Sequence, residues 1–217
     1  MDVRRLRPAP RSTRKAAPST ATATACSTAS TSAPKPLQAA GPPIWIAARD
    51  PLTHAFAVEQ GADVMVTPLA KPDAEVERLV GIFDGACAAN PDVPRPRLLL
   101  LRHAWVGASE AEIDRGVQAL RRFYATFEGW FRNEGNVVDG FCPPIPDAEL
   151  AERPDYAPDV VRASHLVGSP DEVIARLKAY EALGVDQFSL WIDNSLGHAD
   201  KRRMLDLWVD EVLPAFA

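Results

Sequence analysis

Helix and strand signals alternate over residues 168–217, and this alternation restricts the fold more than any other feature. Residues 169–172 (SPDE) combine an N-cap serine, a proline at the first helical position and an acid three residues after the cap, which together form a capping box. Residues 185–192 (VDQFSLWI) are rich in β-branched and aromatic side chains, as strands are. Beyond His198, apolar residues again fall on one helical face. This succession predicts a parallel sheet with helices packed against it.

The same alternation runs through the preceding residues. Leu98 to Leu101 is apolar on both faces, which is typical of a parallel strand. We expect strands at 43–48, 63–68 and 96–106, and helices at 51–60, 73–89 and 109–127. With the last strand, these elements predict four βα units between Pro43 and Ala217, interrupted by an irregular segment from about 129 to 167.

The N-terminal segment differs in composition from the rest of the chain. Residues 1–33 are rich in Ser, Thr and Ala and nearly free of large apolar side chains, which predicts a disordered low-complexity tail. Its Arg-rich, acid-poor composition is also found in organellar transit peptides, but the apolar face of such a peptide is missing. Residues 34–217 are expected to form one folded domain.

Charge and cysteine content exclude several functions. The first 34 residues contain six Arg or Lys and one Asp, so the remaining chain has 24 − 6 = 18 basic and 29 − 1 = 28 acidic residues. This acidic part has no basic stripe, which argues against nucleic acid as a partner. No apolar run approaches the length of a membrane span. Cys26, Cys87 and Cys142 are far apart and odd in number, which favours free thiols in a reducing, cytoplasmic compartment.

Several short sequences, in order and at their observed spacing, resemble the bacterial luciferase-like monooxygenases. Residues 42–51 (PPIWIAARDP) look like the family's fifth strand and the loop after it, and residues 61–63 (GAD) look like the start of its sixth strand. Further similar segments lie at 34–38, 168–173, 184–188 and 211–216. The resemblance begins near Pro34 and matches only the C-terminal half of the family's barrel.

This resemblance implies an α/β fold, the C-terminal (βα)4 half of a TIM-type (βα)8 barrel. The family's first four strands have no counterpart here, which suggests a truncated gene product. Because a half-barrel leaves two sheet edges and one apolar face uncovered, we expect a homo-oligomer.

A cofactor site is expected in the loop after the first strand, because barrel enzymes place their sites at the carboxyl ends of strands. This loop contains Ala48, Arg49, Asp50 and Thr53. The alanine allows close backbone approach, the start of the next helix is an anion site, and Arg49 can add a charge-assisted contact. The resemblance places this region near the cofactor phosphate and so implies FMN. The alternative is that Asp50 is only an N-cap and Arg49 is solvated.

The other strand ends provide substrate-side candidates, namely His103, Trp105 and Asp193. Each also has an ordinary structural interpretation: a hydrogen-bonded core histidine, a packing tryptophan and a turn-forming aspartate. Thr67 and Pro68 are expected to form a turn. The sequence contains no Walker, GxSxG, HExxH or CxxC motif, and its four histidines lack the spacing of metal ligands, so no metal is expected.

The resemblance implies a monooxygenase in which reduced flavin and O2 oxygenate a small organic substrate. A flavin reductase would then be a partner, and neither a membrane nor nucleic acid would be one. Two alternatives stay open: hydride transfer dependent on the deazaflavin F420, and a non-catalytic half-barrel that acts as a remnant or interaction module.

Overall fold

A parallel sheet forms the centre of the computed structural model, which describes residues 35–38, 41–132, 137–143 and 145–217. The expected tail, residues 1–33, lies outside the described residues. Residues from Trp45 to Ala217 form one unit, and the fold described below is that of this unit. Its described strands are β1 (Trp45–Ala47), β2 (Asp63–Val66), β3 (Leu98–Val106), β4 (Leu166–Gly168) and β5 (Gln187–Trp191).

Strand β3 is the central strand, and all of its pairings are parallel. Its first residues pair with β2, residues 99–103 pair with β5, and residues 104–106 pair with β4. Strand β1 extends the sheet beyond β2. The four predicted strands are thereby confirmed. Strand β4 was not predicted, because three residues are too short to show a period and they follow a segment that we expected to be irregular.

Helices follow β1, β2, β3 and β5 as predicted, whereas α4, α5 and η1 lie in the segment that we expected to be irregular. The described helices are α1 (Pro51–Glu59), α2 (Asp73–Ala89), α3 (Glu110–Phe131), α4 (Asp147–Ala151), α5 (Pro158–Ser164), α6 (Pro170–Ala182) and α7 (His198–Leu207), with a 3-10 turn η1 (Pro154–Tyr156). The predicted capping box at Ser169 and Glu172 is present at the start of α6. Gly184 follows α6 with a φ of 98°, the left-handed conformation that glycine adopts without strain.

The last helix is less regular than predicted. Helix α7 ends at Leu207 and continues as a π-helical turn η2 (Trp208–Val212) and a 3-10 turn η3 (Leu213–Phe216). Pro214 explains the change, because it has no N–H to donate to the preceding turn of an α-helix.

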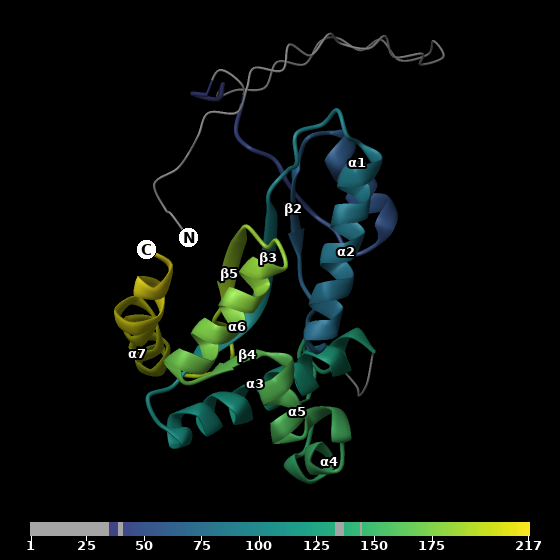
Figure 1. Cartoon of the computed structure of the whole chain (residues 1–217). Coiled ribbons are helices and arrows are strands. Elements are labelled where there is room, and N and C mark those ends of the chain that lie inside the picture. Colours follow the sequence, from purple (N-terminus) through teal and green to yellow (C-terminus); the bar gives the residue numbers. More distant parts are fainter. Residues whose placement is uncertain (1–34, 39–40, 133–136, 144) are drawn as a thin grey trace. The chain divides into compact units, whose positions relative to one another are not determined.

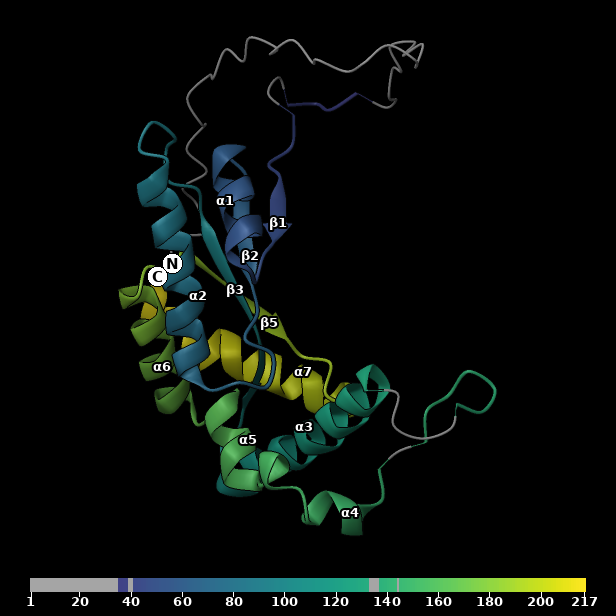
Figure 2. The same cartoon turned by 90° about the vertical axis from the view of Figure 1, so that its right-hand side faces the viewer.

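The two faces of the sheet differ in burial. Val64, Val66, Leu98 and Leu100 are at most 1% exposed, and α2 and α6 lie on one side of the strands in Figure 2. The alternate residues, such as Met65, Leu99 and Leu101, are only half-buried. In Figure 1, β2, β3 and β5 lie between α1 and α2 on one flank and α7 on the other. One face of the sheet therefore carries the core, and the other is apolar but incompletely covered.

Candidate functional site

The four residues predicted to bind a cofactor phosphate lie together where β1 leads into α1: Ala48, Arg49 and Asp50 are in the loop, and Thr53 is in the first turn of α1. Ala48 is buried, and Arg49 is half-buried. Asp50 is the N-cap of α1: its carboxylate accepts hydrogen bonds from the Thr53 amide at 3.0 Å and from the Thr53 hydroxyl at 2.6 Å. These bonds hold the pKa of Asp50 below its usual range. Because Asp50 and Thr53 bind each other, a phosphate site in this loop depends on Arg49.

Arg49 belongs to a charged cluster at the carboxyl ends of β1 and β2. Glu75 of α2 accepts two hydrogen bonds of 2.8 Å from Arg78, whereas the Arg49 Nη2 lies 3.4 Å from the same carboxylate and the Lys71 Nζ lies 4.0 Å from it. The Arg78 bonds are the main reason why the pKa of Glu75 falls to about 2. Glu75 is therefore satisfied without Arg49, and the Arg49 guanidinium, like the Lys71 ammonium, is only loosely held by this carboxylate.

His103 is buried and has partners for both ring nitrogens. Its Nε2 lies 2.9 Å from the main-chain oxygen of Asp193, so Nε2 carries the proton. Its Nδ1 lies 2.7 Å from the hydroxyl oxygen of Tyr124 on α3 and accepts a hydrogen bond from that hydroxyl. Burial lowers the pKa of His103 to about 4, so the ring is neutral. His103 therefore ties β3 to α3 and to the end of β5, with no ring nitrogen available to a substrate.

The other two substrate-side candidates lie apart from each other. Trp105 is buried and its Nε1 donates to the Glu112 carbonyl at 2.9 Å, which makes it a packing residue under α3. Asp193 turns its main-chain oxygen inward to His103, while its exposed carboxylate pairs with Lys201 at 3.2 Å. The structure thus brings Asp193 and His103 together through the backbone and leaves the Asp193 carboxylate at the rim.

An aromatic cluster around His103 was not predicted. The Trp191 ring stacks on His103 with centroids 4.0 Å apart, and the Phe123 ring meets His103 edge-on at 4.8 Å. Phe123 also stacks on Phe127 at 5.7 Å. The i, i+4 spacing of these phenylalanines places both rings on one face of α3. The aromatic rings of this cluster thus extend from Trp191 at the end of β5 to Phe123 and Phe127 on α3.

The buried histidines predict a loss of stability in acid. Burial lowers the pKa of His103 to about 4 and that of His165 to about 3. Between pH 6.5 and 4 the unfolded chain therefore binds protons that the folded chain does not, and the free energy of unfolding decreases as the pH falls through this window. We expect a slope approaching about 1.4 kcal/mol per pH unit for each histidine.

Urea unfolding between pH 7 and 5 tests this prediction, because most carboxylates titrate below that range. His165→Gln should remove about half of the slope. His198→Gln is the control, because His198 is exposed at the start of α7. An unchanged slope in His165→Gln would contradict the prediction.

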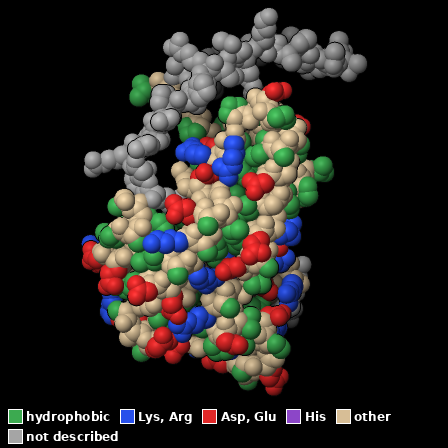
Figure 3. All heavy atoms as spheres, in the orientation of Figure 1, with side chains coloured by type: hydrophobic (Ala, Val, Ile, Leu, Met, Phe, Trp, Pro, Cys, Tyr) green, Lys and Arg blue, Asp and Glu red, His purple; other side chains and the backbone are tan. Residues whose placement is uncertain are grey.

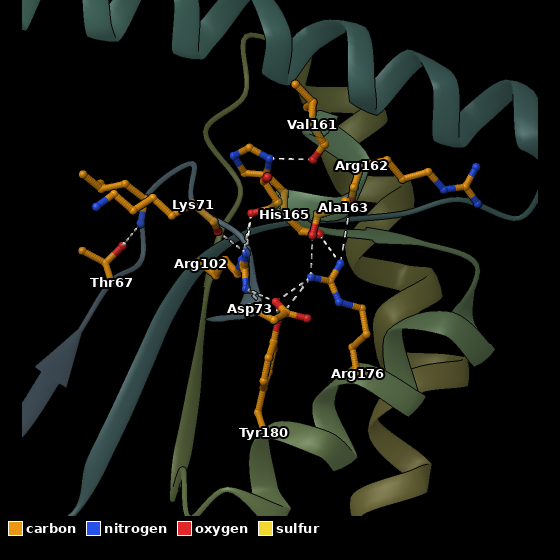
Figure 4. A network of polar contacts seen from close by, with 12 residues as sticks. Thr67, Lys71, Asp73, Arg102, Val161, Arg162, Ala163, His165, Arg176 and Tyr180 are labelled. Atoms are coloured by element: carbon orange, nitrogen blue, oxygen red, sulfur yellow. Dashed lines mark hydrogen bonds and ion pairs between the residues drawn. The ribbon is translucent and has the colours of Figure 1, made fainter. Parts of the chain in front are cut away.

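A buried hydrogen-bond network around Arg102 is a second feature that was not predicted. Arg102 lies in the apolar strand β3, and its neighbours in the chain give no sign of its partners. The side chain is fully buried and donates to the Asp73 carboxylate at 2.6 Å, the Tyr180 hydroxyl at 2.7 Å and the Lys71 carbonyl at 2.6 Å. Its Nε and Nη2 also donate to the Ser164 carbonyl at 3.1 and 2.5 Å. Figure 4 shows the guanidinium at the centre of this network. Arg102 thus joins β3 to α2, α5 and α6.

Arg176 of α6 completes the network from the other side of Asp73. It donates to the Asp73 carboxylate at 2.9 Å and to the main-chain oxygens of Ala163 and His165. Two guanidinium groups therefore share one carboxylate and the carbonyls at the end of α5. These contacts fix the start of β4, so the network has a structural role beside the candidate site.

Metal and membrane features are absent from the residues that the structure describes. No group of three or more His, Cys, Asp or Glu there could hold a metal ion. No helix of the described part is long and apolar enough to cross a membrane. In Figure 3 acidic and basic side chains are interspersed over the visible face, without a continuous basic area.

Parallel βα units with polar loops at the carboxyl ends of their strands define a partial barrel of the α/β class. The family model for luciferase-like monooxygenases matches residues 11–187. The chain belongs to this family. The match begins inside the segment predicted to be a tail, and so earlier than the start near Pro34 that the resemblance gave.

A characterised relative supports the same family. Over 187 residues the chain is 46% identical to the oxygenase component of a flavin-dependent trigonelline monooxygenase from Acinetobacter baylyi, and the alignment covers 86% of this chain and 52% of the relative. The chain spans about half the length of the curated relatives it matches.

Solved structures show the same fold at low sequence identity. A coenzyme F420-dependent tetrahydromethanopterin reductase from Methanopyrus kandleri has a TM-score of 0.56 at 18% identity, covering 81% of this chain and 51% of that one. The oxygenating constituent of 3,6-diketocamphane monooxygenase from Pseudomonas putida, in complex with FMN, has a TM-score of 0.52 at 16% identity, covering 81% and 49%. The described sheet therefore corresponds to about half of a luciferase-like barrel.

Proposed function

We propose that this chain supplies the C-terminal half of a flavin-dependent monooxygenase that oxygenates a small organic substrate with O2. Family membership supports an oxidoreductase, and the loosely held Arg49 at the carboxyl end of β1 is the observation that carries the cofactor proposal. Bound reduced flavin would supply the electrons for the reaction with O2. The role of the protein is to bind the cofactor phosphate, orient the ring and exclude water.

FMN is proposed as the cofactor because Arg49 suits a phosphate. A guanidinium forms charge-assisted hydrogen bonds to phosphate oxygens, and the long contact of 3.4 Å to Glu75 costs little to break. Ala48 places a small buried side chain beside it. Asp50 and Thr53 would hold the loop in shape through the N-cap. F420 remains the alternative within the family, because it also carries a phosphate.

Replacing Arg49 with alanine should weaken FMN binding by about tenfold to a hundredfold, the loss of one charge-assisted bond worth about 1.5–3 kcal/mol. Glu75→Gln should have the opposite effect, because it removes the anion that competes for Arg49. Fluorescence titration of both variants measures the change. Riboflavin, which lacks the phosphate, should bind equally to the wild type and to both variants.

Arg202→Ala is the matched control for the loss of a surface arginine, because Arg202 lies on α7 and pairs with Asp206. Equal FMN affinities for the wild type and Arg49→Ala would remove Arg49 from the site. If no FMN binds at all, the non-catalytic remnant becomes the better interpretation.

Assembly is part of the proposal, because the site is incomplete on half a barrel. Strand β1 is at the edge of the described sheet, and the face with Met65, Leu99 and Leu101 is only half-buried. We infer that a second copy of this chain or a matching half-barrel covers this face. The relative's name, an oxygenase component, supports a flavin reductase as a further partner. Sedimentation of the titrated samples identifies the species that binds FMN.

A further inference from the structure

A groove of about 470 Å³ lies along α3, outside the cofactor loop described above. It is lined by side chains of α3, by residues 140–142 and by Ser195, which follows β5. Residues 137–143 follow α3 in the chain, and Figure 2 shows them beyond its end. Because Ser195 lies in the loop that follows the carboxyl end of β5, the groove opens at the edge of the sheet where barrel enzymes bind substrates.

The groove walls are mainly aromatic. Phe123, Phe127 and Trp130 line it from α3, and Phe141 lines it from the segment that follows α3. Trp130 and Phe141 are 58% and 78% exposed, so these rings lie outside the core and are accessible to a ligand. The Phe127 ring also lies 6.2 Å from that of Trp191, which joins the groove to the cluster around His103. Aromatic rings at these distances offer faces and edges on which a planar ring can pack.

Arg122 supplies a positive charge at the groove. Of the described residues that line it, Arg122 carries a charge and the others are neutral. Arg122 is paired with Asp147 through its Nε at 3.6 Å, but both side chains are largely exposed, 67% and 79%. A long, exposed ion pair of this kind is weak. The guanidinium can therefore turn to a carboxylate in the groove and form charge-assisted hydrogen bonds with it.

The backbone beside the groove is unusual as well. Ser195 has a φ of 65° and Asp139, next to Gly140, has a φ of 51°. Both φ values lie in the left-handed backbone region, which residues other than glycine rarely adopt. Where they do adopt it, the residue is often part of a binding site. The two turns place Ser195 and Gly140 where they line the groove.

We propose that this groove binds an aromatic carboxylate, with its ring between Phe127 and Phe141 and its carboxylate at Arg122. A volume of about 470 Å³ falls within the range of small-molecule sites. The assignment of this ligand as the substrate rests on the proposed function. The binding itself does not, because none of the groove residues belongs to the Arg49 loop.

Calorimetric titration without flavin tests the proposal with three probes. Benzoate should bind, benzamide should bind about tenfold more weakly because it lacks the charge, and cyclohexanecarboxylate should bind more weakly because it lacks the aromatic face. Arg122→Gln should lower the benzoate affinity about tenfold and make benzoate and benzamide equal. Arg122 is largely exposed, so this variant should keep the wild-type fold, which circular dichroism verifies.

Controls separate this proposal from the cofactor proposal. Arg202→Gln and Arg49→Ala should leave benzoate binding unchanged. Equal binding of benzoate and benzamide to the wild type, unchanged benzoate affinity in Arg122→Gln, or no benzoate binding would each overturn the proposal. If FMN still binds in those cases, the flavin proposal stands; if benzoate binds and FMN does not, the cofactor proposal fails alone.

Discussion

Replacing Arg102 with methionine should lower the free energy of unfolding by about 3–5 kcal/mol, because the change leaves buried acceptors without their donor. The guanidinium makes hydrogen bonds to Asp73, Tyr180, Lys71 and Ser164. Asp73 and Tyr180 keep Arg176 as a partner, but the Lys71 and Ser164 carbonyls lose a strong donor. Chemical denaturation measures the change, and the melting temperature should fall by about 2–4 °C per kcal/mol in a chain of this size.

Arg202→Met is the matched control, because the Arg202 side chain is 71% exposed. It should change the stability by less than about 0.5 kcal/mol. A loss below about 1 kcal/mol in Arg102→Met would show that the network contributes little and that methionine packs well in its place.

Replacing Gly116 with alanine should lower the free energy of unfolding by about 2–3 kcal/mol. A Cβ at this position would lie 2.1 Å from Cδ1 and 2.4 Å from Cγ of Trp105. Trp105 is 3% exposed, so its ring has no open space to enter, and moving it breaks the hydrogen bond to Glu112. Overpacking of this kind costs more than the helix gains from replacing a glycine.

Gly85→Ala on α2 is the control, because nothing lies within 4 Å of a Cβ at that position. This variant should be more stable than the wild type by about 0.5–1 kcal/mol, since alanine is the better helix former. Thermal unfolding of both variants, with near-ultraviolet circular dichroism to follow the tryptophans, measures the two effects. Equal stabilities of the two variants would show that Trp105 moves aside at little cost.

The elements with local signals could be predicted from the sequence. The capping box at Ser169, the apolar run from Leu98 and the helical spacing after His198 each act over a few neighbouring residues, and the corresponding helices and strands are present. Strand β4 has no such signal. It exists because residues 104–106 of β3 extend beyond β5 and offer a pairing edge, and a single sequence does not show that edge.

In the candidate site, too, the residues that are neighbours in the chain could be predicted, and the contacts between distant residues could not. Ala48, Arg49, Asp50 and Thr53 are neighbours in the chain, so one loop places them together. The contacts of His103 depend on Tyr124 and Asp193, which are 21 and 90 residues away. The partners of Arg102 are 29 to 78 residues away. No short motif encodes contacts of this length, so polar residues in an apolar strand gave no indication of their partners.

The central position of β3 has a consequence for the order of folding. Leu99 pairs with Met65 on one side, 34 residues earlier, and with Gln187 on the other, 88 residues later. Closing the shorter loop costs less chain entropy, so β1, β2 and β3 should assemble first. During synthesis on the ribosome, the second edge of β3 then waits for β5, and an unpaired edge in that interval is exposed to other nascent chains. Chaperones that shield this edge would raise the yield of the folded protein.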